Sequence, residues 1–501
     1  MKKFAIRWFK RVLRAFAYGA IGAVTMLAVV FVVLLENRPD LKVWHQTELD
    51  AEFTADARVA HLSDYLELEN RLFEQLETEV VERIDAADRR LFNRYYHDSQ
   101  SSPGRWPSNW NRSFELVTDV PRAGVLLLHG MSDSPYSLRA LGMDLHQAGA
   151  WVTALRLPGH GTAPSGLVEL RWQDMAAAVR LAMVHLQEKV GDQPIYILGY
   201  STGGALAVQY ASAALREVDL PEVDGLVMLS PAIGVTSLAA FAVWQARLGH
   251  LLGLDKLAWN AILPEYDPFK YGSFAVNAGD QVYRLTEEIR SELGQLGATD
   301  NLEQFPPVLA FQSVVDATVS TSALVSGLFE HLPASGHELV LFDINRNSEI
   351  ERLLVKAPGP TLQSMLQDPE LGFILTLITN EDMDSSRVVS LKNRPGGGAP
   401  ERTQLDLAWP RSIYSLSHVA LPFPANDPLY GVEKAEQSHG IRLGNLALRG
   451  EKGVLQVPAA DMLRQRWNPF YKYIEQRTLK FMGLETPAEP GHESLAYETG
   501  K

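Results

Sequence analysis

The stretch Pro194–Ala214 reads PIYILGYSTGGALAVQYASAA and decides the fold. An apolar run at Ile195–Leu198 leads into Gly199-Tyr-Ser-Thr-Gly203, and a strong helix former follows from Gly204. The G-x-S-x-G pattern is weakly specific alone, but a strand, a sharp turn and a helix are the setting in which it presents a nucleophilic serine. The glycines keep side chains out of the crowded turn. We therefore expect Ser201 to be a nucleophile; the alternative is an ordinary glycine-rich turn.

Short apolar runs on both sides of this stretch alternate with helix-like segments. Continuous apolar strands that alternate with helices are typical of a mostly parallel sheet covered on both faces. Ligands of such sheets bind beyond the carboxyl ends of the strands. We expect helices at Ser137–Ala148 and Trp172–Lys189 and further strands at Val125–Leu128, Val152–Leu157, Leu226–Leu229, Val308–Phe311 and Leu339–Phe342.

The loop after the first of these strands reads His129-Gly130-Met131. A tetrahedral intermediate of acyl transfer needs two backbone N–H donors, one from the residue after the nucleophile and one from such a loop. We therefore expect Thr202 and Met131 to supply the oxyanion donors. His129 precedes the serine and so does not fit the chain order of a triad histidine, and His160 has no partner at metal-ligand spacing. Both are interpreted as loop-shaping residues.

Three segments together carry a resemblance: LLLHGMSDSPYSLRAL, LRLPGHGTAP and YILGYSTGGALAVQYA. They look like the monoglyceride lipase/lysophospholipase-like branch of the α/β-hydrolase superfamily, which is sometimes grouped with serine aminopeptidases. The match covers about residues 120–345 and resumes around 410–432. The resemblance implies an α/β-hydrolase fold with a cap, a serine nucleophile and hydrolysis of lipid-like esters.

The same resemblance points to an acid and a base. In this fold the triad order is serine, acid, histidine. Asp316 follows the predicted strand and resembles the family's strand–Asp–x–x–Val segment, and Asp343 is the runner-up. His418 resembles the family's Ser-His segment, with His439 as a minor alternative. The catalytic set is thus Ser201, Asp316 and His418.

The domain organisation is expected to follow the composition of the chain. Residues 42–105 form a helical segment, packed on the core or serving as a stalk, with a linker at 100–104. Residues 115–480 form the hydrolase domain, with a cap at 231–306 that includes a helix at Leu238–Leu252 and aromatic residues for an acyl pocket or for anchoring the cap. An insertion at 346–410 contains strand-like runs at Phe373–Ile378 and Val388–Leu391, and residues 484–501 form a flexible tail.

The N-terminus combines a basic head with an apolar run. Residues 1–14 contain six Lys and Arg and no acid, and residues 15–35 are uncharged. As a helix, this run spans roughly 30 Å, the thickness of a bilayer core. A retained transmembrane anchor is favoured over a cleaved signal peptide, whose apolar region is shorter. Basic residues stay on the cytoplasmic side, so the hydrolase domain would lie outside the cytoplasm, in the periplasm of a bacterium with two membranes.

Composition narrows the function. The net charge of −14 argues against binding of nucleic acid, which requires a positively charged surface. The absence of cysteine excludes disulfides, thiolate metal sites and a cysteine nucleophile. We expect a membrane-anchored serine esterase with a small-molecule or lipid ester substrate, without cofactor or metal. The alternatives are an amide or peptide hydrolase that uses the same triad, and a catalytically silent hydrolase-fold scaffold.

Overall fold

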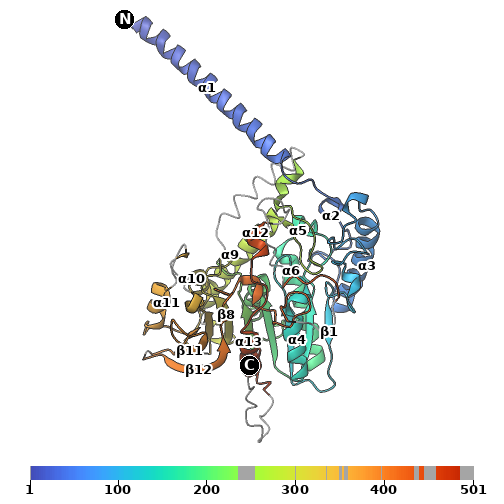
Figure 1. Cartoon of the computed structure of the whole chain (residues 1–501), viewed down its shortest axis with the longest axis vertical. Coiled ribbons are helices and arrows are strands. Elements are labelled where there is room, and N and C mark those ends of the chain that lie inside the picture. The colour runs from blue at the N-terminus through green and yellow to red at the C-terminus, as the bar shows by residue number, and fades with distance from the viewer. Residues whose placement is uncertain are drawn as a thin grey trace.

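A computed structural model describes residues 2–234, 254–299, 301–334, 336–348, 353–354, 359–396, 398–433, 439–444 and 458–485. Its centre is a ten-stranded sheet in the order β1-β3-β2-β4-β5-β8-β9-β10-β11-β12 (Figure 1). The seven neighbours from β3 to β10 are parallel, and β1, β11 and β12 pair antiparallel at the two ends. The strands are β1 (Phe114–Leu116), β2 (Ala123–Leu128), β3 (Ala150–Leu155), β4 (Ile195–Tyr200), β5 (Gly225–Leu229), β8 (Val308–Ser313), β9 (Glu338–Phe342), β10 (Ile374–Asn380), β11 (Arg387–Asn393) and β12 (Glu401–Ala408).

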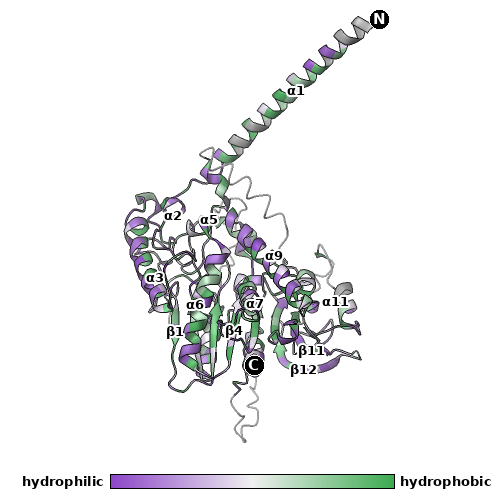
Figure 2. Ribbon diagram, turned by 180° about the vertical axis from the view of Figure 1, so that it is seen from behind, coloured by the Kyte–Doolittle hydropathy of each residue, from purple (hydrophilic) through white to green (hydrophobic). Residues whose placement is uncertain are grey.

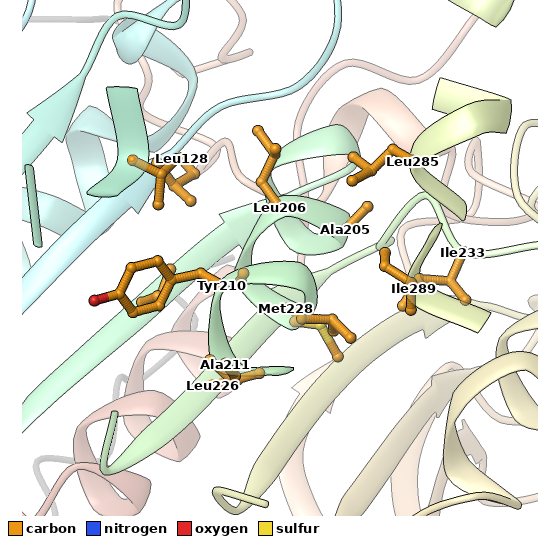
Figure 3. Close-up of a cluster of buried hydrophobic side chains, with 14 of the residues drawn as sticks. Leu128, Ala205, Leu206, Tyr210, Ala211, Leu226, Met228, Ile233, Leu285 and Ile289 are labelled. Carbon is orange, nitrogen blue, oxygen red and sulfur yellow. The ribbon is translucent and has the colours of Figure 1, made fainter. Parts of the chain in front are cut away.

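The sheet separates two apolar cores, because alternate side chains of each strand point to opposite faces. Leu126 and Leu128 of β2 pack under α6 (Trp172–Val190), α7 (Thr202–Ala214) and α9 (Val276–Ala298). Val125 and Leu127 pack on the other face, under α4 (Arg139–Gln147) and α13 (Tyr471–Phe481). Figure 3 shows the first core around α7, with Leu285 of α9 beside Leu206. The expected mostly parallel sheet with helices on both faces is confirmed.

The segment before the sheet is built into the body. It contains α2 (Val43–Gln46) and α3 (Leu62–Leu76). Tyr65 of α3 is fully buried and donates its hydroxyl to the main-chain oxygen of Arg156 at 2.6 Å. The buried Arg156 guanidinium in turn pairs with Glu52 at 2.9 Å and Glu69 at 3.2 Å. These contacts agree with the interpretation of residues 42–105 as a segment packed on the core.

The expected linker at residues 100–104 is wrong. Ser101 is fully buried and donates its hydroxyl to the main-chain oxygen of Tyr266 at 2.6 Å, and the amide of Ile441 donates to the main-chain oxygen of Gln100 at 3.1 Å. Small polar residues mark a linker only when solvent satisfies them. Here the protein's own backbone does so.

The insertion at 346–410 extends the sheet. The two expected strand-like runs lie in β10 and β11, and β10 pairs parallel with β9. The strand β12 was not predicted. Its first four residues are all exposed and only its second half alternates between half-buried and exposed residues, so this edge strand lacks the apolar signature of a buried strand.

The cap and the tail are described in part. The expected helix at Leu238–Leu252 lies outside the described residues, as does the tail from 486 onward. In the described part of the cap, β6 (Trp259–Ala261) pairs with β7 (Phe274–Ala275), and α9 packs on α7. Leu484, placed in the expected flexible tail, is instead buried in the core beneath α13.

The N-terminal helix α1 (Lys2–Glu36) extends away from the body, and no other element runs along it in either view (Figures 1 and 2). Large apolar side chains on it are exposed, among them Phe16, Ile21 and Val24. Among the residues that the structure describes, no helix combines the length and the apolar character needed to cross a membrane.

Candidate active site

Ser201 occupies the sharp turn between β4 and α7. Its backbone angles, φ 52° and ψ −114°, lie in a region that residues other than glycine rarely adopt. The turn holds because Ser201 donates its amide to the main-chain oxygen of Leu229 at 2.9 Å, and because its own carbonyl accepts the first bonds of α7. A Cβ atom on Gly203 would lie 1.9 Å from the main-chain oxygen of Leu128. Glycine is therefore required for β2 to approach this turn.

His418 lies within hydrogen-bond distance of this serine. Its Nε2 atom is 3.1 Å from Ser201 Oγ. The histidine begins a short helical turn (His418–Ala420), and its ring is buried beside that of Tyr200, at 5.5 Å between ring centroids. The structure thus brings together two side chains that are 217 positions apart in the chain.

Asp316, just after β8, holds the other side of the imidazole. Its Oδ2 atom is 2.8 Å from His418 Nδ1, and its Oδ1 atom accepts from the amides of Thr318 at 2.8 Å and Val319 at 3.0 Å. Burial alone would raise the pKa of Asp316, but the hydrogen bonds from His418 and the two amides outweigh it and lower the pKa. An ionised carboxylate only accepts, so His418 Nδ1 carries a proton. In the neutral imidazole, Nε2 is then free to accept the Ser201 proton.

The runner-up candidates lie elsewhere. Asp343 follows β9 and forms an ion pair with Arg346 at 2.9 Å. His439 packs its ring on Trp106 at 4.8 Å. His129 accepts the amide proton of Leu157 on Nε2 at 3.0 Å, and burial lowers its pKa well below the usual value. His129 thus ties one loop at the sheet edge to the next, which agrees with its interpretation as a loop-shaping residue.

Met131 and Thr202, the two expected oxyanion donors, lie near the serine. Thr202 opens α7, where the first amides of a helix have no partner inside the helix. The amide of Met131 lies in the loop after β2. Neither amide has a hydrogen-bond acceptor within the described ranges of the chain. Both residues line the same cavity as Ser201.

This cavity has a volume of about 290 Å³ and lies between the triad and the cap. Apolar and small side chains, including Val282 and Phe274, form much of its wall. Lys270 and Arg464 also line it, and the sequence did not indicate either residue. They come from the cap and from the segment before α13, far from the motifs in the chain. No group of three or more potential metal ligands is found in the part of the chain that the structure describes.

Part of the chain is similar to a known protein family and to characterised relatives. Residues 119–344 match the family model described as serine aminopeptidase, S33. A thermostable monoacylglycerol lipase of Bacillus sp. (strain H-257) is 27% identical over 173 residues, which cover 34% of this chain and 65% of the relative. Phospholipase YtpA of Bacillus subtilis (strain 168) is 25% identical over 147 residues, which cover 29% and 51%. The chain thus spans less than two thirds of the length of each relative.

Solved structures are similar over a comparable part of the chain. A monoacylglycerol lipase of Paleococcus ferrophilus is 23% identical, with a TM-score of 0.34, and the match covers 46% of this chain and 88% of that one. A soluble variant of monoglyceride lipase from Saccharomyces cerevisiae is 16% identical, with a TM-score of 0.34, and the match covers 46% and 82%.

Proposed function

We propose that this chain, whose residues 119–344 belong to the α/β-hydrolase family in its monoglyceride lipase-like branch, hydrolyses a carboxylic ester through an acyl-serine intermediate. The observation that carries the proposal is the continuous contact from Ser201 Oγ to His418 at 3.1 Å and from His418 to Asp316 at 2.8 Å. A serine hydroxyl becomes nucleophilic when an oriented base accepts its proton.

In the proposed first step, Ser201 Oγ forms a bond to the ester carbonyl carbon, and its proton passes to His418 Nε2. The carbonyl oxygen becomes an anion that accepts from the amides of Met131 and Thr202. When the bond from carbon to the alcohol oxygen breaks, His418 gives its proton to the departing alcohol. Asp316 stays ionised throughout and stabilises the protonated imidazole.

Water completes the proposed cycle. His418 takes a proton from a water molecule, whose oxygen attacks the acyl-serine carbonyl. A second oxyanion forms and collapses, the bond from carbon to Ser201 Oγ breaks, and the proton on His418 returns to the serine. The products are one carboxylic acid and one alcohol. No cofactor takes part in this scheme.

Lipid-like esters are the proposed substrate class. The names of the two relatives, a monoacylglycerol lipase and a phospholipase, both describe cleavage of lipids. The wall of the 290 Å³ cavity contributes Met131, Phe274 and Val282 as apolar contacts for an acyl chain. The same triad chemistry also cleaves amides, so matched esters and amides belong in the substrate screen.

The esterase proposal is tested with a fluorophosphonate probe on the full chain. Wild type should be labelled and Ser201→Ala should not, together with loss of hydrolysis of p-nitrophenyl butyrate. Ser212→Ala is a matched control, because Ser212 is a fully buried serine of α7, the helix that follows Ser201, and its hydroxyl has no hydrogen-bond partner among the described residues. An unreactive wild type would favour the silent scaffold, and labelling of Ser201→Ala at the wild-type rate would assign the nucleophile to another residue.

Anchoring of the chain to a membrane is a separate proposal and rests on the uncharged run at residues 15–35 behind six cations. It would place the hydrolase domain outside the cytoplasm. The full chain should then stay in the membrane pellet after alkaline carbonate extraction. The variant Val24→Arg/Val29→Arg should move to the supernatant, whereas Val218→Arg, a change at a fully exposed residue of the body, should not. Extraction of the wild type at alkaline pH would contradict the proposal.

A further inference from the structure

A second cavity of about 220 Å³ lies beside the cavity at Ser201, beneath the cap. The two cavities are adjacent and share six lining residues, namely Ser132, Asp133, Lys270, Phe274, Val419 and Arg464. An ester carbonyl placed at Ser201 would therefore leave the remainder of a long substrate in this outer cavity. What lines the outer cavity decides which substrates fit.

Three cationic side chains line the outer cavity: Lys270, Arg464 and Arg466. Lys270 forms an ion pair with Asp133, at 3.1 Å. Among the described residues, the hydrogen-bond partners of the two arginines are neutral. Arg464 donates to Thr318 Oγ1 at 3.2 Å, and Arg466 donates to the Tyr266 hydroxyl at 3.1 Å and to a main-chain oxygen at 3.4 Å. Across the described residues, neither guanidinium has a carboxylate within 4.0 Å.

The described carboxylates of the same cavity form no ion pair with these guanidinium groups, although the charge of Asp267 helps to raise the pKa of Arg466. Asp133 is held by Lys270. Asp267 is buried and accepts from the Tyr430 hydroxyl at 2.6 Å and from the amide of Phe269 at 3.0 Å. Asp461 lies on the wall without reaching ion-pair distance of either arginine. The wall of the outer cavity therefore presents two guanidinium groups, one exposed on Arg464 and one half-buried on Arg466, with no carboxylate among the described residues at ion-pair distance.

We propose that the outer cavity binds an anionic group of the ester substrate, a phosphate by preference, through Arg464 and Arg466. This inference rests on the proposed esterase function. A planar guanidinium donates two parallel N–H bonds to phosphate or carboxylate oxygens, and such charge-assisted bonds are stronger than neutral ones. The substrate class is then a single-chain lipid ester whose alcohol part carries a phosphate.

The test compares two lipids with the same oleoyl chain, 1-oleoylglycerol and 1-oleoylglycerol 3-phosphate, in micelles of one nonionic detergent. The readout is the ratio of kcat/KM for the phosphorylated lipid to that for the neutral lipid. Arg464→Gln/Arg466→Gln should lower this ratio at least about tenfold, the effect of losing one charge-assisted contact. Arg464→Lys/Arg466→Lys should keep part of it, because charge remains while the fork is lost.

Arg180→Gln is the matched control, because Arg180 is an arginine of α6 that pairs with Glu217 at the surface, and the ratio should not change. An equal loss on both lipids would overturn the proposed subsite. Hydrolysis of p-nitrophenyl butyrate and fluorophosphonate labelling report on the esterase proposal separately. If hydrolysis of p-nitrophenyl butyrate and labelling persist while the ratio of kcat/KM is the same in the arginine variants as in wild type, only the proposal of an anionic subsite is wrong.

A measurement on the wild type tests the anionic subsite even if the variants fail to fold. Glycerol 3-phosphate should slow fluorophosphonate labelling of Ser201 more than glycerol does at the same ionic strength. Equal protection by the two compounds would overturn the subsite. Equal protection by inorganic phosphate and glycerol 3-phosphate would assign the arginines to a free anion and overturn the assignment to the substrate.

Discussion

Arg38 and Lys256 bind each other in both directions. The Arg38 guanidinium donates to the main-chain oxygen of Lys256 at 2.7 Å, and Lys256 Nζ donates to the main-chain oxygen of Arg38 at 2.9 Å. Arg38 also donates to the main-chain oxygen of Trp259 at 2.6 Å, and Lys256 pairs with Asp40 at 2.8 Å. These bonds join the chain just after α1 to the described cap segment at 254–261.

Loss of this clamp should loosen the cap segment. In Arg38→Ala the carbonyls of Lys256 and Trp259 lose a charged donor, and such bonds contribute about 1.5–3 kcal/mol each at most. Hydrogen exchange followed by mass spectrometry should show faster exchange in residues 254–261. Arg180→Ala removes an arginine from a surface ion pair and serves as control. Unchanged exchange at 254–261 in Arg38→Ala would show that the clamp does not hold the cap.

Two glycines should respond in opposite ways to the same substitution. Gly203→Ala brings a Cβ atom to 1.9 Å from the main-chain oxygen of Leu128, so β2 or the serine turn has to move. We expect loss of activity and strong destabilisation. Gly294→Ala lies within α9, and nothing stands within 4 Å of the added atom. Alanine there should stabilise by about 0.5–1 kcal/mol.

Thermal melts and fluorophosphonate labelling of the two glycine variants provide the measurement. If Gly203→Ala has the stability and the labelling rate of wild type, the turn can accommodate a Cβ atom at this position despite its close contact with β2. Destabilisation by Gly294→Ala would show that α9 is constrained at this position by something other than helix propensity.

The turn at Ser201 was predictable because its determinants are local. The strand, the glycines and the helix former are contiguous in the sequence, and the φ of 52° at Ser201 is the strained geometry that the motif implies. By contrast, β3 was placed two residues too late. Arg156 and Leu157 look like the continuation of an apolar strand, but Arg156 turns away to pair with Glu52 and Glu69 from the N-terminal segment. A partner so distant in the chain leaves no local signal.

The base was predictable for a different reason. About 75 residues separate β9 from His418, and β10, β11 and β12 lie in this interval and extend the edge of the sheet. Periodicity does not place His418, whereas its similarity to the family's Ser-His segment does. The guanidinium groups of Arg464 and Arg466 had neither kind of signal. Whether these arginines can bind an anion depends on the distance of each guanidinium group to the nearest carboxylates, and only the folded structure gives these distances.

Asp316→Asn should separate the proposed acid from its former rival. The amide cannot hold the imidazole as a carboxylate does, so kcat should fall about 10³–10⁴-fold. Asp343→Asn should keep kcat near the wild-type value while it lowers stability, because Arg346 then loses its buried partner. Steady-state kinetics with p-nitrophenyl butyrate and thermal melts measure the two effects. A larger loss of kcat in Asp343→Asn than in Asp316→Asn would exchange the two assignments.

Buried histidines should make the fold sensitive to acid. Burial lowers the pKa of His160 and of His337 from 6.5 to about 4. The unfolded chain therefore takes up a proton first as the pH falls below 6.5, so stability decreases between pH 6.5 and about 4 and is unaffected by these groups above that window. Each histidine contributes a slope of up to about 1.4 kcal/mol per pH unit.

His337→Leu isolates one of these groups. His337 is buried before β9, and within the described residues neither of its ring nitrogens has a hydrogen-bond partner. Urea unfolding at pH 7.5, 6.0 and 5.0 should give a shallower decrease in the free energy of unfolding for His337→Leu than for wild type. The comparison cancels the carboxylates, which titrate in both proteins. The same slope in both would mean that the folded protein takes up a proton at His337 as readily as the unfolded chain does. Exposed His331 offers the control, and His331→Gln should follow the wild-type curve.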